Sequence, residues 1–412
     1  MDRDKGVNAF NSKAAKVMAR GDTADVVIVG GGIVGCTTAY NLARRGARVV
    51  LFEKDDIAQE ASGRNRGNIR LQLRDRLELP LVREAIALWQ RADEELGMST
   101  EYRTTGNLLV TYHDDIAAGF AAEAERHRGL GIDARVVPRD ELREHVPDIS
   151  PDIVAGFLTT EDGHANPQKA TWAFATAARR AGADIRTGTR VTSLMIEGAA
   201  VRGVATDQGT VSAPVVLNAG GVRAPGLFVP LGITVPITPA KHQILVTARL
   251  PLVTRPYLRC AGPRVSFCQT LEGTLLLGMG PAQAVGFDTS VSRVHMSNIM
   301  RETIRLVPTL ASAPVVRAWT GWFEMTPDDL PVITEIPDHR GFYICAGFSG
   351  HGFALAPAIG RLMAHLILDG AATHPIDAFG LDRFAGAQRD AREHTPASVI
   401  SRLGRLTAEG LH

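Results

Sequence analysis

Short apolar runs and amphipathic stretches alternate at the start of the chain. Val26–Val29 consists of β-branched residues, which is typical of a strand buried on both faces of a parallel sheet. The next segment, Ile33 to about Arg45, has helical periodicity, and Gly46 favours an end to the helix at that point. Ala47–Phe52 predicts a second buried strand. This order predicts a strand–helix–strand unit of the kind that builds a parallel sheet.

Farther along the chain, the periodicity switches between helical and extended segments. Helices are predicted over Pro80–Leu96, Asp114–Leu130, Arg139–His145, Gln168–Ala181, Val291–Leu306 and Pro357–Leu368. Strands are predicted over Ala134–Val137, Asp184–Thr187, Arg190–Ile196, Ala200–Thr206, Thr210–Val211, Pro214–Asn218, His242–Ala248, Val265–Gln269, Thr274–Gly278 and Phe342–Ala346. Tyr102–Tyr112 is interpreted as a hairpin or strand pair around Gly106 and Asn107. The stretch from Pro80 to His145 lacks strand–helix–strand alternation, which indicates the start of a different domain.

The turn between the first strand and the helix carries the pattern G-x-G-x-x-G at Gly30–Gly35. In such a turn the first glycine allows the tight bend, the second lets the backbone approach a pyrophosphate, and the third lets helix and strand pack closely. Glu53 follows the second strand; it can accept hydrogen bonds from ribose hydroxyls and would repel a 2′-phosphate, which argues against NADP. The pattern predicts a dinucleotide site but does not separate FAD from NAD, and an accidental glycine-rich turn is the alternative.

Three further stretches combine glycines with hydrogen-bonding groups. Ala58–Arg70 is dense in small and polar residues, so we interpret it as a loop that touches a bound group, with a solvated basic loop as the alternative. Ala219–Gly221 follows a predicted strand and has the form of a second cofactor contact, although an ordinary turn fits the pattern as well. Gly347–Phe353 lies between a strand and a helix, which favours a site for an anion or a ring edge.

Composition narrows the range of partners. The 412 residues carry a net charge of +1, so nothing points to nucleic acid or to a charged membrane surface, and no apolar run reaches membrane-spanning length. Cys36, Cys260, Cys268 and Cys345 lack metal-binding spacing, so no metal is expected, and their scatter fits a reducing, cytoplasmic compartment. Met1–Thr23 lacks the apolar core of a signal peptide and is interpreted as a flexible or surface-docked extension.

Five motifs in this order resemble one family, the D-amino-acid oxidase-like FAD-dependent oxidoreductases. They are VVIVGGGIVGC (Val26–Cys36) with Glu53, SGRNRGNIR (Ser62–Arg70), VVLNAGG (Val215–Gly221), MTPDDLPVI (Met325–Ile333) and GFSGHGFALAPAIG (Gly347–Gly360). Within the family the chain is most similar to the branch of sarcosine oxidase β subunits, opine oxidase B-type subunits, glycine-oxidising cyanide synthase subunits and hydroxyproline dehydrogenases.

The resemblance implies an α/β fold of two domains. A Rossmann-like FAD-binding domain of the D-amino-acid oxidase type is expected from segments 24–75, 166–223 and 336–372. A substrate domain built on a mixed or antiparallel sheet is expected from 76–165 and 224–335, and 373–412 is left as a C-terminal segment. The FAD would lie extended, with its flavin at the domain interface, where ligand pockets tend to occur.

The resemblance also implies which residues contact the FAD. They are Gly30, Gly32, Ile33, Val34, Gly35, Glu53 and Lys54 around the first turn; Ser62, Gly63, Arg64, Asn65, Gly67 and Asn68 in the loop; Val191, Ala219 and Gly220; and Gly347, Ser349, Gly350, His351, Gly352 and Phe353.

The chemistry implied by the resemblance is oxidation of a C–N bond. A C–H bond beside an uncharged amine passes a hydride to flavin N5, and water hydrolyses the resulting imine. The substrate would be an amino acid or secondary amine of the opine, hydroxyproline, proline, glycine or sarcosine type. No protein acid–base pair is required, so the chain must supply orientation, a dry pocket, a carboxylate anchor and positive charge near the flavin.

Candidate catalytic residues follow from the same resemblance. His351 would place its imidazole at the flavin, with a helix cap as the alternative, and Arg70 matches a family arginine that holds the ring or the substrate carboxylate. Lys241 and His242, with Arg259 and Arg264, are further candidates for the carboxylate, each of them open to the interpretation of an ordinary surface charge. Trp319, Trp322 and Phe323 fit either a pocket wall or a core.

Four positions depart from the family pattern. Monomeric sarcosine oxidases attach FAD through a cysteine that aligns near Gly321, so non-covalent FAD is expected here. Their carboxylate-binding lysine aligns with Ala354, which makes sarcosine itself doubtful, and their oxygen-activating lysine aligns near Leu276, which favours a dehydrogenase over an oxidase. The histidine that attaches FMN in heterotetrameric β subunits falls near Pro167, so a covalent FMN is not expected, while a non-covalent FMN at a subunit interface stays open.

Three other hypotheses remain open on the sequence. The chain could be the FAD-carrying subunit of a hetero-oligomer with other redox subunits, or a homo-oligomer. It could bind FAD without turnover. An NAD-dependent dehydrogenase would explain Gly30–Glu53 but would leave Gly347–Gly360 without a use.

Overall fold

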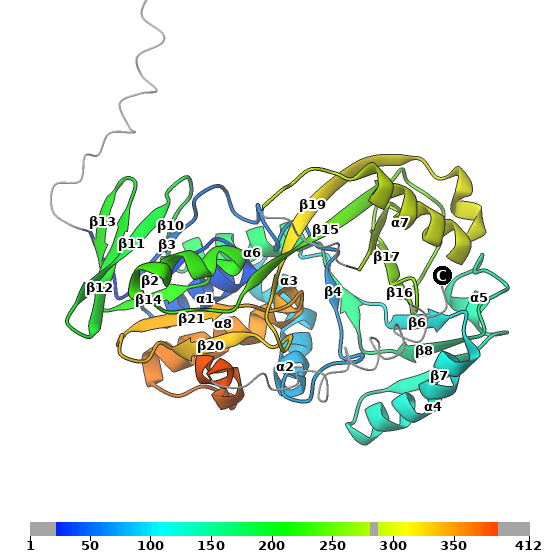
Figure 1. Cartoon of the computed structure of the whole chain (residues 1–412), viewed down its shortest axis with the longest axis horizontal. Helices are drawn as coiled ribbons and strands as arrows, with labels where there is room; N and C mark the ends of the chain where they lie inside the picture. The colour runs from blue at the N-terminus through cyan, green and yellow to red at the C-terminus, as the bar shows by residue number, and fades with distance from the viewer. Residues whose placement is uncertain (1–21, 281–286, 386–412) are drawn as a thin grey trace, which may run out of the picture.

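The computed structural model describes residues 22–280 and 287–385. Two large sheets occupy opposite halves of an elongated molecule, with helices packed on each (Figure 1). The long strands β15 (Thr238–Thr247) and β19 (Val315–Met325) run from one half towards the other. The two halves therefore share an interface to which several distant segments of the chain contribute.

The first half is built on a six-stranded sheet. Its order is β10 (Asp184–Arg186), β3 (Val49–Phe52), β2 (Val26–Val29), β14 (Val215–Asn218), β21 (Phe342–Ala346) and β20 (Val332–Glu335). All neighbouring pairs are parallel except β20 with β21. Because central parallel strands are covered on both faces, they are apolar throughout, as the runs at β2 and β21 are. The predicted Rossmann-like α/β fold is confirmed.

Helices cover one face of this sheet and a smaller sheet covers the other. The helices are α1 (Ile33–Arg44), α2 (Leu79–Gln90), α3 (Ala92–Leu96), α6 (Pro167–Arg180) and α8 (Gly352–Asp369), whose apolar faces form one core with the strands. The smaller sheet has the order β1 (Asp22–Thr23), β13 (Gly209–Ser212), β12 (Ala200–Thr206) and β11 (Val191–Glu197), and encloses a second core.

The second half is built on an eight-stranded mixed sheet. Its order is β19, β15, β18 (Leu275–Met279), β17 (Val265–Gln269), β16 (Tyr257–Cys260), β6 (Asn107–Thr111), β8 (Ala155–Thr159) and β7 (Ala134–Pro138). Every neighbouring pair is antiparallel except β16 with β6. One core lies beneath α7 (Arg293–Leu306) and beside α5 (Leu142–His145), and another lies beneath α4 (Asp114–Gly129).

Shorter elements complete the chain. A three-stranded sheet joins β4 (Asn68–Ile69), β9 (Gly163–His164) and β5 (Arg103–Thr104), and β4 lies between the two halves (Figure 1). The 3₁₀ helices are η1 (Gly221–Leu227), η2 (Val229–Leu231), η3 (Pro308–Ser312), η4 (Asp377–Phe379) and η5 (Leu381–Phe384).

Three predictions about local structure need correction. Tyr102–Tyr112 is not a hairpin, because β5 and β6 belong to different sheets; the N–H groups of Thr105 and Gly106 both donate to the carbonyl of Asp162 and turn the chain away. The helix predicted over Pro80–Leu96 is divided at Arg91, whose backbone (φ −108°, ψ 1°) is not helical. The last helix starts at Gly352 rather than Pro357, which lies inside it.

The amino-terminal extension expected from the sequence is only partly covered by the described residues. The extension Met1–Thr23 lies outside them except for Asp22 and Thr23, which form β1 and pair with β13.

Among the helices of the described segments, α8 alone is long and apolar enough to cross a membrane by length and composition, yet 61% of that stretch is buried in the core.

Candidate cofactor and substrate site

The glycine turn between β2 and α1 forms a close-fitting cradle. Gly30 has φ +113°, and a Cβ there would lie 2.4 Å from the carbonyl oxygen of Ala219 on the neighbouring strand exit. A Cβ at Gly35 would lie 2.0 Å from the carbonyl oxygen of Gly30, so the helix packs on the turn as predicted. Gly32 caps α1 without a side chain of its own, and the hydroxyl of Ser62 accepts from the Ile33 N–H at 2.9 Å. Phosphate oxygens are the kind of acceptor that such a helix start favours.

Glu53 lies at the end of β3 beside this turn. Its Oε2 accepts from the Gly31 N–H at 2.7 Å and its Oε1 from the Asp55 N–H at 2.9 Å, so the carboxylate is fixed against the glycine turn. Lys54, which the sequence predicts to contact the cofactor, forms an ion pair with Asp55 and lies 3.5 Å from Glu60. The fixed carboxylate of Glu53 is available to ribose hydroxyls at the edge where the strands end.

The second helix start lies two strands away at the same edge of the sheet. β21 ends at Ala346, and the chain then turns through Gly347 (φ +76°), Ser349 (φ +50°) and Gly350 (φ +85°) into α8. His351 occupies the N-cap position of α8, and its side chain forms no capping hydrogen bond within the segments that the structure describes. Parallel sheets bind ligands outside the carboxyl ends of their strands, so the starts of α1 and α8 bracket a site suited to an extended cofactor.

A buried group of charged side chains lies next to the start of α8. The Arg70 guanidinium donates to the carbonyls of Gln72 and Leu73, and Arg259 on β16 donates to the Gln72 side-chain oxygen at 3.2 Å. Arg74 lies 3.4 Å from the Glu78 carboxylate at the start of α2. We call the set Arg70, Arg74, Glu78, Asp162, Arg259 and His351 the arginine cluster.

His351 and Glu78 link the arginine cluster to α8. The His351 Nδ1 lies 3.1 Å from Glu78 Oε2. Although burial opposes ionisation of Glu78, the neighbouring His351 and Arg74 lower the pKa of its carboxyl. Burial, together with Arg74, lowers the pKa of His351 to about 4, so this imidazole is neutral at pH 7. The neutral ring then donates its Nδ1–H to Glu78 and keeps the lone pair on Nε2.

The arginine cluster contains more cations than anions. Asp162 accepts from the Leu71 N–H at 2.6 Å and from the Thr159 hydroxyl at 2.6 Å, and burial raises the pKa of this carboxyl to about 6. With both acids ionised and the imidazole neutral, three arginines face two carboxylates. Burial lowers the pKa of Arg70 well below its usual range and that of Arg259 to about 10. A guanidinium in a protein nevertheless keeps its charge at pH 7. An additional anion would balance this charge.

Another arginine, Arg66, packs against one face of the eight-stranded sheet, the face that carries His242, Tyr257 and Ser266 and that we call the inner face. Its guanidinium reaches from the Ser62–Arg70 loop to the Tyr257 hydroxyl at 2.8 Å, the Ser266 hydroxyl at 3.0 Å and the His242 Nε2. Burial and the adjacent Arg66 hold the pKa of His242 well below its usual range. The sequence interpretation treated Arg66 only as part of a loop; its partners lie more than 170 residues away in the chain, so no local pattern could identify them.

Other predicted residues are distributed between this face and its opposite. Phe323 lies on the inner face: its ring is 4.8 Å from that of His242, and a Cβ at Gly350 would be 3.5 Å from it. Lys241, next to His242 on β15, points the other way and forms an ion pair with Asp288 at 2.8 Å. The structure thus brings His242, Phe323 and Arg66 together and leaves Lys241 apart. Arg264 is exposed.

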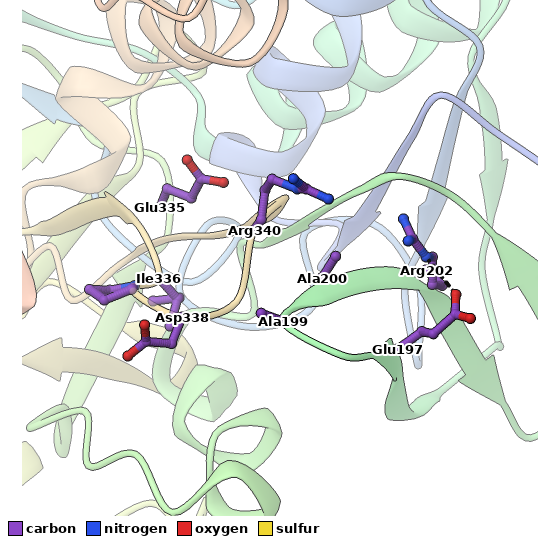
Figure 2. A pocket seen from close by; sticks show the side chains of 9 residues that line it. Glu197, Ala199, Ala200, Arg202, Glu335, Ile336, Asp338 and Arg340 are labelled. Carbon is purple, nitrogen blue, oxygen red and sulfur yellow. Dashed lines mark hydrogen bonds and ion pairs between the residues drawn. The ribbon is translucent and has the colours of Figure 1, made fainter.

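One surface pocket lies away from all these groups. It has a volume of about 490 Å³ and is lined by Glu197, Ala199, Ala200, Arg202, Glu335, Ile336, Pro337, Asp338 and Arg340 (Figure 2). Arg340 precedes β21, so the pocket lies at the amino end of that strand, opposite the edge with the glycine turns. Its position separates it from the candidate cofactor and substrate site.

Fold and site together describe a dinucleotide-binding α/β oxidoreductase scaffold, and comparison with known proteins gives the family. Residues 25–366 match the model of the DAO family, described as FAD dependent oxidoreductase, and the chain belongs to this family. Family membership supports FAD as the cofactor.

Three relatives illustrate the range of similarity. Mitochondrial dimethylglycine dehydrogenase of Rattus norvegicus is 28% identical over 408 residues, covering 93% of this chain but 47% of that protein. Sarcosine oxidase subunit beta of Arthrobacter sp. is 29% identical and covers 87% of this chain and 91% of that one. The structure of L-proline dehydrogenase from P. horikoshii superimposes with a TM-score of 0.84 at 30% identity, covering 89% and 98% of the two chains. The chain therefore spans about half the length of the dimethylglycine dehydrogenase it matches.

The residues of this chain fit an FAD. Replacing the hydrogen of Gly30 or Gly35 by a Cβ would collide with backbone, so these positions keep the turn open. The N-cap residues of α1 and α8, Gly32 and His351, form no side-chain capping bond within the described part of the chain. FAD itself would supply the acceptor for a hydride.

Proposed function

We propose that this chain is an FAD-dependent dehydrogenase that oxidises the C–N bond of an amino acid or secondary amine and binds the FAD non-covalently. The observation that carries the proposal is the arginine cluster, whose excess positive charge adjoins the start of α8 through the His351–Glu78 contact. A substrate carboxylate is the anion that would balance this charge. Gly321 cannot form a covalent bond to the cofactor through its side chain.

The chain's own residues would act by orienting the substrate and by excluding water. Arg70 and Arg259 converge on Gln72 and would hold the carboxylate, which fixes the neighbouring C–N bond. His351 Nε2, whose lone pair is free when Nδ1–H donates to Glu78, would accept a hydrogen bond from the substrate nitrogen and so orient it. Phe323, beside both His242 and Gly350, would help to exclude water.

The proposal is tested by the visible spectrum of the purified chain under anaerobic conditions. We expect flavin absorption that bleaches when one member of a panel of amino acids, N-alkyl amino acids and opines is added. Colour that returns slowly in air, and quickly with an artificial acceptor, identifies a dehydrogenase. A colourless protein, or a flavin that no amine reduces, contradicts the proposal.

A second candidate is the same activity within a hetero-oligomer. It is favoured by the similarity to a protein named sarcosine oxidase subunit beta. Purification from the native host should then yield stoichiometric partner chains, and acid extraction would reveal any FMN held between subunits. Recovery of an active single chain contradicts this candidate.

A further inference from the structure

Arg66 is held by neutral side chains from three strands. The hydroxyls of Tyr257 and Ser266 and the Nε2 of His242 accept its hydrogen bonds, and all three acceptor residues are buried. Within residues 22–280 and 287–385, no carboxylate pairs with this guanidinium. Its positive charge is therefore oriented by its neighbours but not neutralised by them.

The sheet is shaped to receive this guanidinium. Gly278 on β18 pairs with Ser266 on β17, and a Cβ at Gly278 would lie 1.7 Å from Arg66 Nη1. The missing side chain thus makes room for Arg66 against the backbone of β18. His242 faces Arg66 through its Nε2, and its buried Nδ1 has no hydrogen-bond partner among residues 22–280 and 287–385.

Arg66 and the arginine cluster meet on one face of the sheet. Tyr257 and Arg259 lie two residues apart on β16, so their side chains point to the same face. Ser266, which accepts from Arg66, is the cross-strand partner of Arg259. Opposed residues of neighbouring strands have Cβ atoms about 5 Å apart. Two cationic groups therefore adjoin one another beside the proposed substrate position.

We infer that the substrate is an amine that carries two carboxylates, one bound by Arg70 and Arg259 and the other by Arg66. This inference rests on the proposed function, because it assigns the second anion to the same substrate. The second carboxylate stands either on the nitrogen substituent, as in an N-(carboxyalkyl) amino acid, or on the carbon side chain, as in an acidic amino acid. Arg66 would then be the residue that distinguishes dicarboxylic from monocarboxylic amines.

Binding of compounds without an oxidisable amine tests the inference separately from turnover. On the FAD-loaded protein, calorimetry would compare thiodiacetate and its longer dicarboxylic homologues with (methylthio)acetate. It would also compare 2-hydroxyglutarate with 2-hydroxybutyrate. In one of the two series we expect the dicarboxylate to bind about ten- to hundredfold more tightly, the range for a charged hydrogen-bonded contact. The series that shows the preference identifies where the second carboxylate stands.

Variants of Arg66 identify the residue responsible. Arg66→Gln should reduce the ratio of dicarboxylate to monocarboxylate affinity at least tenfold, and Arg66→Lys should retain part of it. If Arg66→Gln does not fold, Gly278→Ala displaces the guanidinium without removing its charge and should lower the same ratio. Arg143→Gln, which removes an exposed positive charge in the same half of the molecule, is the matched control and should leave the ratio unchanged.

Two results would overturn the inference. One is a ratio near one in both series with the unaltered protein. The other is an Arg66→Gln variant that weakens dicarboxylates and monocarboxylates equally, which would assign Arg66 to the cofactor or the fold. Either result can occur while monocarboxylic amines still bleach the flavin, and in that case the proposed function stands.

Discussion

The carboxyl of Glu324 is buried beside the turn that leads from β21 into α8, and its surroundings change its pKa. Glu324 lies near the end of β19, and the backbone N–H groups of Gly347 and Phe348 donate to its carboxyl. Its Oε2 is buried and finds no hydrogen-bond partner in the described part of the chain. Burial outweighs those two hydrogen bonds and raises the pKa of Glu324 to about 7. A carboxyl of this kind holds its proton at a pH where an exposed glutamate has lost it.

This pKa predicts a pH-dependent contribution to stability. Because the folded chain binds the Glu324 proton more tightly than the unfolded chain, the stabilisation is complete below about pH 4.5 and is lost as the pH rises through about 7. Glu324→Gln carries no such charge, so at pH 8 it should unfold at a higher urea concentration than the parent. Its free energy of unfolding should be higher by at most about 3 kcal/mol. At pH 5 the two should differ little.

Urea unfolding at pH 5, 6, 7 and 8 measures this effect. Glu335→Gln, at an exposed glutamate on β20, the next strand along the chain, is the control and should show no such pH-dependent gain. A gain for Glu324→Gln that is the same at every pH would contradict the assignment to ionisation and would point to packing instead.

At the scale of elements, the first strand–helix–strand unit is the best predicted part of the chain. The runs Val26–Val29 and Ile33–Arg44 match β2 and α1 because their signals are local: β-branching, helical period and glycine positions. β16 and β8 were missed. Tyr257–Cys260 is only four residues long, and the apolar positions of Ala155–Thr159 show no clear alternation. Such strands exist because neighbours in the sheet pair with them, which no single segment reveals.

The packing of α1 on α8 makes a quantitative prediction at this scale. A Cβ at Gly360 in α8 would lie 2.5 Å from the backbone carbon of Thr37 in α1, so the two helices approach more closely than any side chain allows. Gly360→Ala should therefore lower the free energy of unfolding by about 1–3 kcal/mol, even though alanine favours helix.

Gly119 provides the matched control for that change. It lies in α4, and a Cβ there would meet none of the described residues within 4 Å. Gly119→Ala should raise the free energy of unfolding by up to about 1 kcal/mol. Urea denaturation of both variants measures the effects; equal changes in both would show that helix propensity, rather than the α1–α8 contact, decides the outcome at Gly360.

At the scale of the whole molecule, the proposed substrate site depends on both halves. Arg259 comes from the eight-stranded sheet, Glu78 from the start of α2, and His351 from the start of α8 on the six-stranded sheet. The sequence identified Arg70, His351 and, as one of several cations, Arg259. It could not show that they meet, since their spacing in the chain carries no period, and for the same reason it missed Arg66 and Glu78.

The division of the chain into two domains stays a prediction. The strand β20 pairs with β21, although the sequence placed β20 in the other domain.

Arg259 offers a test of this joint construction. Arg259→Met keeps much of the side-chain volume but removes the positive charge that the second half contributes to the arginine cluster. If Arg259 holds the substrate carboxylate, KM should rise about ten- to hundredfold. The kcat should change less, because His351 and Glu78 remain in place. Steady-state kinetics with an artificial electron acceptor, at saturating FAD, measures both values.

Two comparisons distinguish a role of Arg259 in binding the substrate carboxylate from a role in the fold. Arg76→Met removes an exposed positive charge close in sequence to the arginine cluster and should leave KM within about twofold. An ester of the substrate lacks the carboxylate, so its kcat/KM should be nearly the same for the parent and Arg259→Met. If the ester loses as much as the free acid, Arg259 supports the fold between the two halves rather than the substrate carboxylate, and the excess charge of the cluster would need a different partner.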